Sequence, residues 1–114
     1  LGDMFSNEVL EKLSGLDLVI SNPPYITGDE MKVLDKRVLN EPNEALFGGE
    51  DGLDYYRNIA RVYKDKLKSG AAICFEVGYS QADDVLEILQ REGYRNPCEK
   101  KDFSGIRRAV GALK

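Results

Sequence analysis

The stretch Leu-Asp-Leu-Val-Ile-Ser-Asn-Pro-Pro-Tyr, residues 16–25, decides the fold. Its first part is mostly apolar and predicts a buried β-strand over Leu16–Ser21. The strand must end at Asn22, because two consecutive prolines can continue neither a helix nor a hydrogen-bonded ladder. Residues 22–28 are therefore expected to form a rigid loop at the carboxyl end of a strand. In open α/β sheets, ligands bind beyond the carboxyl ends of the strands.

Capping patterns predict short helices on both sides of this stretch. Upstream, Ser6 is a suitable N-cap for a helix that continues to Leu13, with Gly15 as its left-handed stop. Downstream, Thr27–Glu30 has the spacing of a capping box and opens a helix that continues to about Arg37.

A long irregular stretch follows over Val38–Glu50. It contains the apolar pair Leu46-Phe47, which needs burial. We therefore expect a lid or a binding loop rather than a linker.

A longer amphipathic helix is predicted next. Asp51 is its expected N-cap and Gly70 its expected end. One apolar stripe recurs along it at spacings of three and four residues, and we expect its tyrosines to lie in the core. The stripe consists of Leu53, Tyr56, Ala60, Tyr63 and Leu67.

The remaining sequence predicts strand, helix and hairpin in that order. Ala71–Val77 is a continuous apolar run, as in strands that are covered on both faces. Ser80 then caps a helix that ends at Gly93, with Ala82, Val85, Leu86 and Leu89 facing inward. Tyr94–Lys101 and Ile106–Leu113 are expected to be two antiparallel strands joined by a tight turn. The whole order predicts a three-layer α/β sheet of parallel strands with an antiparallel hairpin at its edge.

Composition sets limits on the class of protein. With 114 residues, 42% of them hydrophobic and 32% charged, the chain is at most one small globular domain. No apolar stretch is long enough to cross a bilayer, so we expect no membrane and a cytoplasmic location. The chain begins with Leu rather than Met, at a point typical of the middle of a fold, so we expect a fragment of a longer protein.

The net charge and the cysteines argue against a large nucleic-acid-binding surface and against a metal site. The net charge of −4 disfavours a large phosphate-binding surface, although Lys100–Lys101 and Arg107–Arg108 remain as small basic groups. Cys74 and Cys98 are far apart in sequence and lack metal-ligand spacing, and the chain contains no His. We therefore expect two reduced structural thiols and no metal site.

The residues of the loop could hold a planar nitrogen group. The Asn22 side-chain oxygen can accept a hydrogen bond from one N–H, and the Pro23 carbonyl can accept from the other. The prolines fix the direction of that carbonyl by locking φ, and Tyr25 offers a flat face for an amide or a base. A simple turn is the alternative, but Pro-Pro-Tyr directly after a buried strand is an unusual way to build one.

Several motifs resemble one group of enzymes. Residues 18–26, LVISNPPYI, look like the catalytic block of methyltransferases that act on exocyclic or amide nitrogens, such as DNA adenine-N6 and protein glutamine-N5 enzymes. Residues 41–57, EPNEALFGGEDGLDYYR, resemble specifically the glutamine N5-methyltransferases of peptide chain release factors. EVGYSQ at 76–81 and KDFSG at 101–105, with the Arg107–Arg108 pair, extend the similarity along the whole chain.

This resemblance implies a fold and a cofactor. Residues 1–114 would be the C-terminal half of a single Rossmann-like class I methyltransferase domain that uses S-adenosylmethionine, with the N-terminal cofactor-binding half missing. No glycine-rich turn between a strand and a helix occurs in the chain. The isolated fragment should therefore bind the cofactor weakly and be inactive alone.

The resemblance also implies residue roles. Asn22, Pro23, Pro24 and Tyr25 would bind the substrate glutamine, with Asn22, Pro23 and Tyr25 as the catalytic residues. Asn22 would also lie close to the cofactor. Asp3 would accept from the adenine amino group and Met4 would pack on the ring, where the family often has an aromatic residue. A solvated Asp3 near the end of the fragment is the alternative.

Roles for three other charged residues stay open. Glu41, with Gly48–Gly49, either shapes the pocket wall or only sets the course of the loop. Glu76 is either a pocket carboxylate or a cap for the following helix. Arg57 is more simply a surface residue in an ion pair than a catalytic one.

Three functions are compatible with the sequence. The first is methylation of a release factor glutamine. The second is methylation of another target, either adenine N6 in DNA, which the acidic charge disfavours, or a ribosomal protein glutamine. The third is a non-catalytic role for the fragment as a substrate-binding module. The preferred release factor and the oligomeric state are open.

Overall fold

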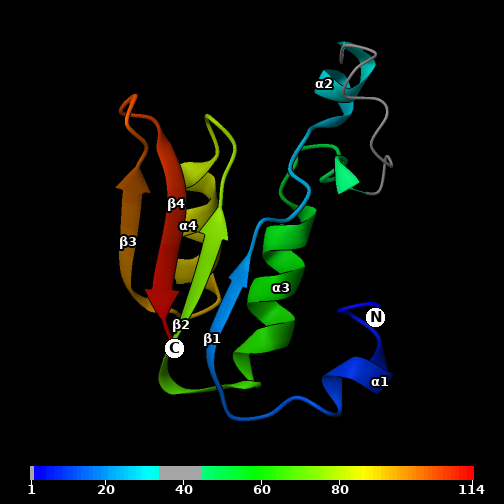
Figure 1. Cartoon of the computed structure of the whole chain (residues 1–114), viewed down its shortest axis with the longest axis vertical. Coiled ribbons are helices and arrows are strands. Elements are labelled where there is room, and N and C mark those ends of the chain that lie inside the picture. The colour runs from blue at the N-terminus through cyan, green and yellow to red at the C-terminus, as the bar shows by residue number, and fades with distance from the viewer. Residues whose placement is uncertain (1, 34–44) are drawn as a thin grey trace.

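A computed structural model of the chain describes residues 2–33 and 45–114 (Figure 1). Four helices and four strands are defined in this part of the chain. In order they are α1 (Asn7–Leu10), β1 (Leu16–Ser21), α2 (Gly28–Val33), α3 (Asp54–Lys64), β2 (Leu67–Glu76), α4 (Ala82–Arg91), β3 (Arg95–Lys101) and β4 (Arg107–Leu113). The predicted strand Leu16–Ser21 is confirmed at both ends.

The strands form one mixed sheet in the order β1-β2-β4-β3. β1 and β2 are parallel, and Ser21 lies opposite Phe75 at their carboxyl ends. β4 returns antiparallel between β2 and β3. The prediction of parallel strands followed by an antiparallel hairpin is therefore confirmed.

The core lies between the sheet and a layer made by α3 and α4, which contact each other and the strands (Figure 1). Alternate residues of β2, namely Ala71, Ile73 and Phe75, are buried in this core together with Val19 of β1. Such a period of two indicates a sheet that is covered on one face. All five residues of the predicted apolar stripe are buried, so its tyrosines belong to the core as expected.

The opposite face of the sheet is open among the described residues. Leu18 and Ile20 of β1 are 50% and 74% exposed. The sequence predicted strands covered on both faces, whereas residues 2–33 and 45–114 provide two layers. The reason is that α3 and α4 both pack on the face that carries Val19 and Phe75.

Some predicted helix ends are wrong. α1 stops at Leu10 rather than Leu13, although Ser6 is its N-cap as expected and accepts from the Val9 amide. α3 begins at Asp54, three residues after the predicted cap Asp51, and ends at Lys64.

The boundary between α3 and β2 is set by strand pairing. Leu67 lies opposite Leu16 of β1, so it belongs to the sheet and not to the predicted helix. Gly70, which was expected to end that helix, lies within β2. The apolar stripe therefore continues past the end of α3 into the first residue of a strand.

Two predicted N-caps are also wrong. Leu53 precedes α3 and Gln81 precedes α4, in place of Asp51 and Ser80, and neither makes a side-chain cap hydrogen bond. Asp51 instead accepts from the Leu53 amide at 3.0 Å and pairs with Arg57.

The predicted capping box of α2 is confirmed. The Thr27 hydroxyl accepts from the Glu30 amide at 3.2 Å, and the Glu30 carboxylate accepts from the Thr27 amide at 2.9 Å. The predicted continuation of this helix to Arg37, and residues 38–44 of the predicted lid, lie outside the described residues.

No helix within residues 2–33 and 45–114 is long and apolar enough to cross a membrane.

The two cysteines lie on either side of β4. Cys74 of β2 and Cys98 of β3 are both opposite Gly111, and both are free thiols. A Cβ atom on Gly111 would lie 3.0 Å from the Cys74 sulfur and 3.6 Å from the Cys98 sulfur. Strands with one strand between them are separated by about 9–10 Å, which is too far for the Cα atoms of a disulfide.

We predict that the two thiols differ in reactivity. Cys98 is exposed, whereas burial, and secondarily the neighbouring Cys98, raises the pKa of the Cys74 thiol. Less thiolate and less access should make alkylation of Cys74 slower by about tenfold or more at mildly alkaline pH. Timed alkylation with iodoacetamide, followed by peptide mass spectrometry, measures both rates. The difference should disappear in denaturant, and equal rates in the folded protein would contradict the prediction.

Candidate functional site

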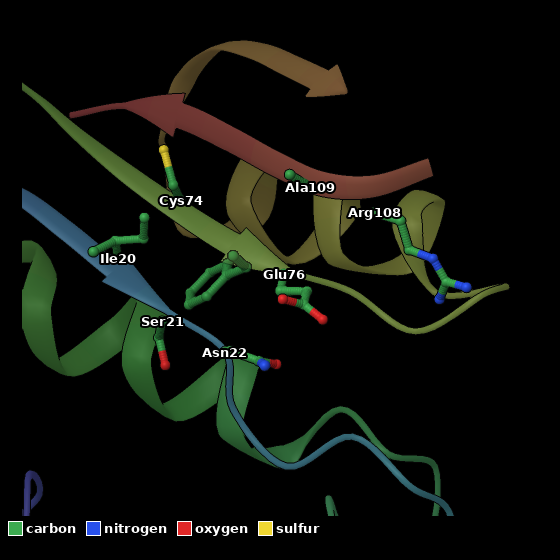
Figure 2. A pocket seen from close by; sticks show the side chains of 8 residues that line it. Ile20, Ser21, Asn22, Cys74, Glu76, Arg108 and Ala109 are labelled. Carbon is green, nitrogen blue, oxygen red and sulfur yellow. The ribbon is translucent and has the colours of Figure 1, made fainter. Parts of the chain in front are cut away.

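The parallel pairing of β1 and β2 brings two polar residues to the same edge of the sheet. Because Ser21 lies opposite Phe75, the strands end together, with Asn22 just after β1 and Glu76 as the last residue of β2. β4 runs the other way, so Arg108 near its start lies at this edge as well. Figure 2 shows these side chains around one pocket.

This pocket is a cleft of about 730 Å³. Apolar atoms make up most of its wall, while Asn22 and Glu76 are exposed to solvent. A volume of this size is typical of small-molecule sites. The cleft is lined by Ile20, Ser21, Asn22, Cys74, Phe75, Glu76, Arg108 and Ala109 (Figure 2).

Backbone hydrogen bonds fasten the loop that follows Asn22. The Ile26 amide donates to the Leu46 carbonyl at 2.9 Å, and the Gly48 amide donates to the Ile26 carbonyl at 2.9 Å. Ile26 and Phe47 thus form a parallel bridge outside the main sheet. The loop is held by the segment that resembles the glutamine methyltransferases.

Gln81 joins the same loop to two other segments. Its Nε2 donates to the Tyr25 carbonyl at 3.1 Å and to the Gly52 carbonyl at 3.2 Å. Its Oε1 accepts from the Gly78 amide at 3.0 Å. The side chain is buried, and both polar atoms of its amide have partners.

Close backbone packing completes the support of the loop. A Cβ atom on Gly48 would lie 2.7 Å from both the Pro24 carbonyl oxygen and the Tyr25 Cα. Gly52 has φ of +73°, and a Cβ atom there would collide with the Tyr25 carbonyl oxygen. Both positions therefore favour glycine, which has no Cβ atom.

Tyr56 connects the core to the edge of the cleft. Its hydroxyl donates to the Glu76 carbonyl at 2.9 Å, and its ring packs edge-on against Phe75. Burial, with smaller contributions from Tyr25 and Glu76, raises the pKa of the Tyr56 hydroxyl. Tyr56 therefore stays a neutral donor and fixes the end of β2.

The four predicted loop residues together line one small cavity, and two of them also border larger clefts. Asn22 lines the 730 Å³ cleft. Pro23 and Pro24 line a separate cavity of about 180 Å³ with Asn22 and Tyr25. Tyr25 also lines a third cleft of about 460 Å³, beside Gln81. The loop is thus bordered by two clefts and one smaller cavity.

The predicted cofactor residues lie elsewhere. The Asp3 carboxylate accepts from the Phe5 amide at 2.9 Å, and the Met4 carbonyl accepts from the Tyr63 hydroxyl at 2.8 Å. Asp3 is exposed and Met4 packs against the core. Neither residue lines any of the three clefts described above.

Arg57 and Glu76 have different surroundings. Arg57 makes exposed ion pairs with Asp51 and Asp54, as its surface interpretation predicted. The Arg57 hydrogen bond holds the pKa of the Asp51 carboxyl below its usual range. Glu76 lines the cleft and is not the N-cap of α4. Glu41 lies outside the described residues.

Potential metal ligands do not gather in the described part of the chain. Within residues 2–33 and 45–114, no group of three His, Cys, Asp or Glu residues could hold a metal ion.

Comparisons with known proteins connect this geometry to a family. No protein-family model matches the sequence. The release factor glutamine methyltransferase of Clostridium acetobutylicum is 42% identical over 114 residues, which is 99% of this chain and 40% of that protein. The protein of the same name from Fusobacterium nucleatum is 41% identical over 106 residues, or 92% of this chain and 30% of that protein.

The chain belongs to this family. It spans 40% and 30% of the length of these two relatives. As their name states, the relatives are methyltransferases, which take a methyl group from a donor.

Solved structures agree with the fold. A release factor-specific protein-(glutamine-N5) methyltransferase from Alicyclobacillus acidocaldarius superposes with a TM-score of 0.59 at 27% identity, covering 94% of this chain and 53% of that one. A methyltransferase from Pyrococcus furiosus gives a TM-score of 0.60 at 15% identity, covering 89% and 42%, which concerns the fold alone. The class I methyltransferase fold expected from the sequence is therefore confirmed.

No sequence pattern indicated that Gln81 and Tyr56 support the loop and the end of β2. Gln81 ends the EVGYSQ motif without an evident role, and Tyr56 was expected only in the core. Both act through main-chain carbonyl groups that are distant in sequence. A sequence pattern reports side-chain types and spacing, so it does not reveal such partners.

We predict that Gly52→Ala destabilises the protein more than Gly70→Ala. Both glycines have positive φ, which costs an alanine about 1–2 kcal/mol. A Cβ atom at Gly70 would meet open space, whereas one at Gly52 would collide with the Tyr25 carbonyl oxygen. The difference between the two free energies of unfolding, measured in urea, isolates the collision. We expect a further loss of about 1–3 kcal/mol for Gly52→Ala. Equal losses of the free energy of unfolding in the two variants would show that the loop accommodates the added Cβ atom without cost.

Proposed function

We propose that the protein containing this chain transfers a methyl group from S-adenosylmethionine to the side-chain amide nitrogen of a glutamine in peptide chain release factors. The observation that carries the proposal is similarity to release factor glutamine methyltransferases along 99% of the chain. The position of Asn22 on a cleft at the carboxyl edge of the sheet agrees with it.

The proposed chemistry depends on orientation. An amide nitrogen is a poor nucleophile because its lone pair is delocalised into the carbonyl group. The Asn22 side-chain oxygen and the Pro23 carbonyl would accept from its two N–H groups and so favour developing positive charge on nitrogen. The Tyr25 ring would support the amide plane. Alignment with an already electrophilic methyl group would then supply much of the rate.

The residues of the cleft are compatible with part of a cofactor site. The apolar wall made by Ile20, Phe75 and Ala109 suits an uncharged portion of the cofactor, and the Glu76 carboxylate suits a positive charge. S-adenosylmethionine would supply the methyl group.

Asp3 and Met4 stay proposed contacts of the adenine. The Asp3 side chain is exposed, so its carboxylate can accept a further hydrogen bond besides that from the Phe5 amide. Because neither residue lines a cleft around Asn22, another part of the cofactor site would have to join the two regions.

We further propose that residues 1–114 are the C-terminal portion of a longer methyltransferase domain. The matched region is 40% of the relative from Clostridium acetobutylicum. The exposed face with Leu18 and Ile20 would pack against the preceding half of the domain, which would also hold most of the cofactor. A substrate that acts in translation termination would place the reaction in the cytoplasm.

The first test is methylation of a release factor. The full-length protein is incubated with a release factor and S-adenosylmethionine labelled in its methyl group, and then with a variant whose substrate glutamine is changed. We expect label in the first protein and none in the second. Equal labelling of both would refute the glutamine assignment. Label in DNA would instead support methylation of adenine N6, and label in a ribosomal protein would support methylation of a glutamine there.

The second test concerns Asn22. If its side-chain oxygen orients the acceptor amide, Asn22→Ala should lower kcat by about 10²–10³-fold. The matched control is Asn58→Ala on α3, because Asn58 lines none of the three clefts. Thermal unfolding should change little for the Asn22 variant, since this residue is exposed. An Asn22 variant with unchanged kcat would remove this residue from the proposed site.

A further inference from the structure

We propose that Gln81 is a positioning residue that holds the Asn22–Tyr25 loop in the geometry needed for methyl transfer, without touching the substrate. This inference rests on the proposed function. Its structural part can also be tested without any activity.

The first argument is the burial and bonding of the Gln81 amide. The residue is 8% exposed, and within residues 2–33 and 45–114 it is the one buried residue whose side chain is an amide or carries a charge. Its two donated hydrogen bonds reach Tyr25 and Gly52, which lie 56 and 29 residues away in sequence. Removing the donors would leave both carbonyl groups without this partner, and the Gly52 carbonyl group would lose a buried hydrogen bond.

The second argument is that the amide does not serve its own helix. Gln81 stands at the N-cap of α4 but makes no side-chain cap hydrogen bond. Asp, Asn, Ser or Thr would cap a helix better at that position. The longer side chain of Gln instead reaches across to the loop.

The third argument is the stiffness of the loop. Gln81 fixes the carbonyl of Tyr25, and the two residues before Tyr25 are prolines, whose rings lock φ. Few soft torsions therefore separate this carbonyl from Asn22. A restraint at Tyr25 is transmitted to the Pro23 carbonyl and the Asn22 side chain. A displacement of about 1 Å at such groups can lower the rate about 10²-fold.

The test compares Gln81→Glu with the matched control Gln90→Glu, since Gln90 is exposed on the same helix. Gln81→Glu keeps the shape but removes both donors. We expect kcat of the full-length enzyme to fall about 10- to 100-fold, with the Kd of the cofactor changed less than about twofold. Lowering the pH should restore part of the activity, because protonation returns one donor to the introduced carboxyl, whose pKa burial raises.

A second measurement does not depend on activity. Amide hydrogen exchange of Ile26 and Gly48 should become about tenfold faster or more in Gln81→Glu, while exchange in the core of β2 stays unchanged. Gln81→Met, which removes the hydrogen bonds without adding charge, should behave in the same way.

The outcomes separate this inference from the proposed function. If the wild-type protein methylates no release factor, the proposed function fails, and hydrogen exchange alone decides whether Gln81 holds the loop. Unchanged kcat and exchange in the Gln81 variants would overturn the inference. Global unfolding of both variants would overturn it as well, because Gln81 would then support the whole fold rather than the loop.

Discussion

The parallel pairing of β1 with β2 is the constraint on which the rest of the site depends. Its register makes Ser21 and Phe75 neighbours, so both strands end at one edge and their next polar groups, Asn22 and Glu76, border the same cleft. A shift by one residue would turn Val19 away from the core and reverse every side chain of β1. The same inward residues that bury the core therefore determine where the polar groups lie.

The loop after β1 is rigid for reasons that come from different parts of the chain. Prolines at 23 and 24 limit the torsions of the loop itself. Gly48 and Gly52 allow close backbone packing, and Gln81 supplies hydrogen bonds from the start of α4. Such convergence is typical of sites that must hold groups within a fraction of an ångström.

Hydrophobic periodicity and turn residues predicted the elements that local sequence determines. Leu16–Ser21 and the closing hairpin have the expected places, because alternation and turn chemistry act locally. Predictions failed where tertiary contacts decided the outcome. Asp51 bonds to Arg57 instead of capping α3, and Leu67 pairs with β1 instead of continuing a helix. The roles of Asp3 and Met4 came from resemblance and stay predictions, since neither residue lines a cleft around Asn22.

In residues 2–33 and 45–114, the open face of the sheet borders the largest of the three clefts around Asn22. Leu18 and Ile20 are half or more exposed, and fully burying such a side chain contributes about 1.5–3 kcal/mol. The 730 Å³ cleft is lined by Ile20 from this same face. Whatever covers this apolar face would stabilise the sheet and close the cleft at the same time. A segment that packs on Leu18 and Ile20 would therefore couple its own folding to closure of the cleft, because both depend on the same surface of β1.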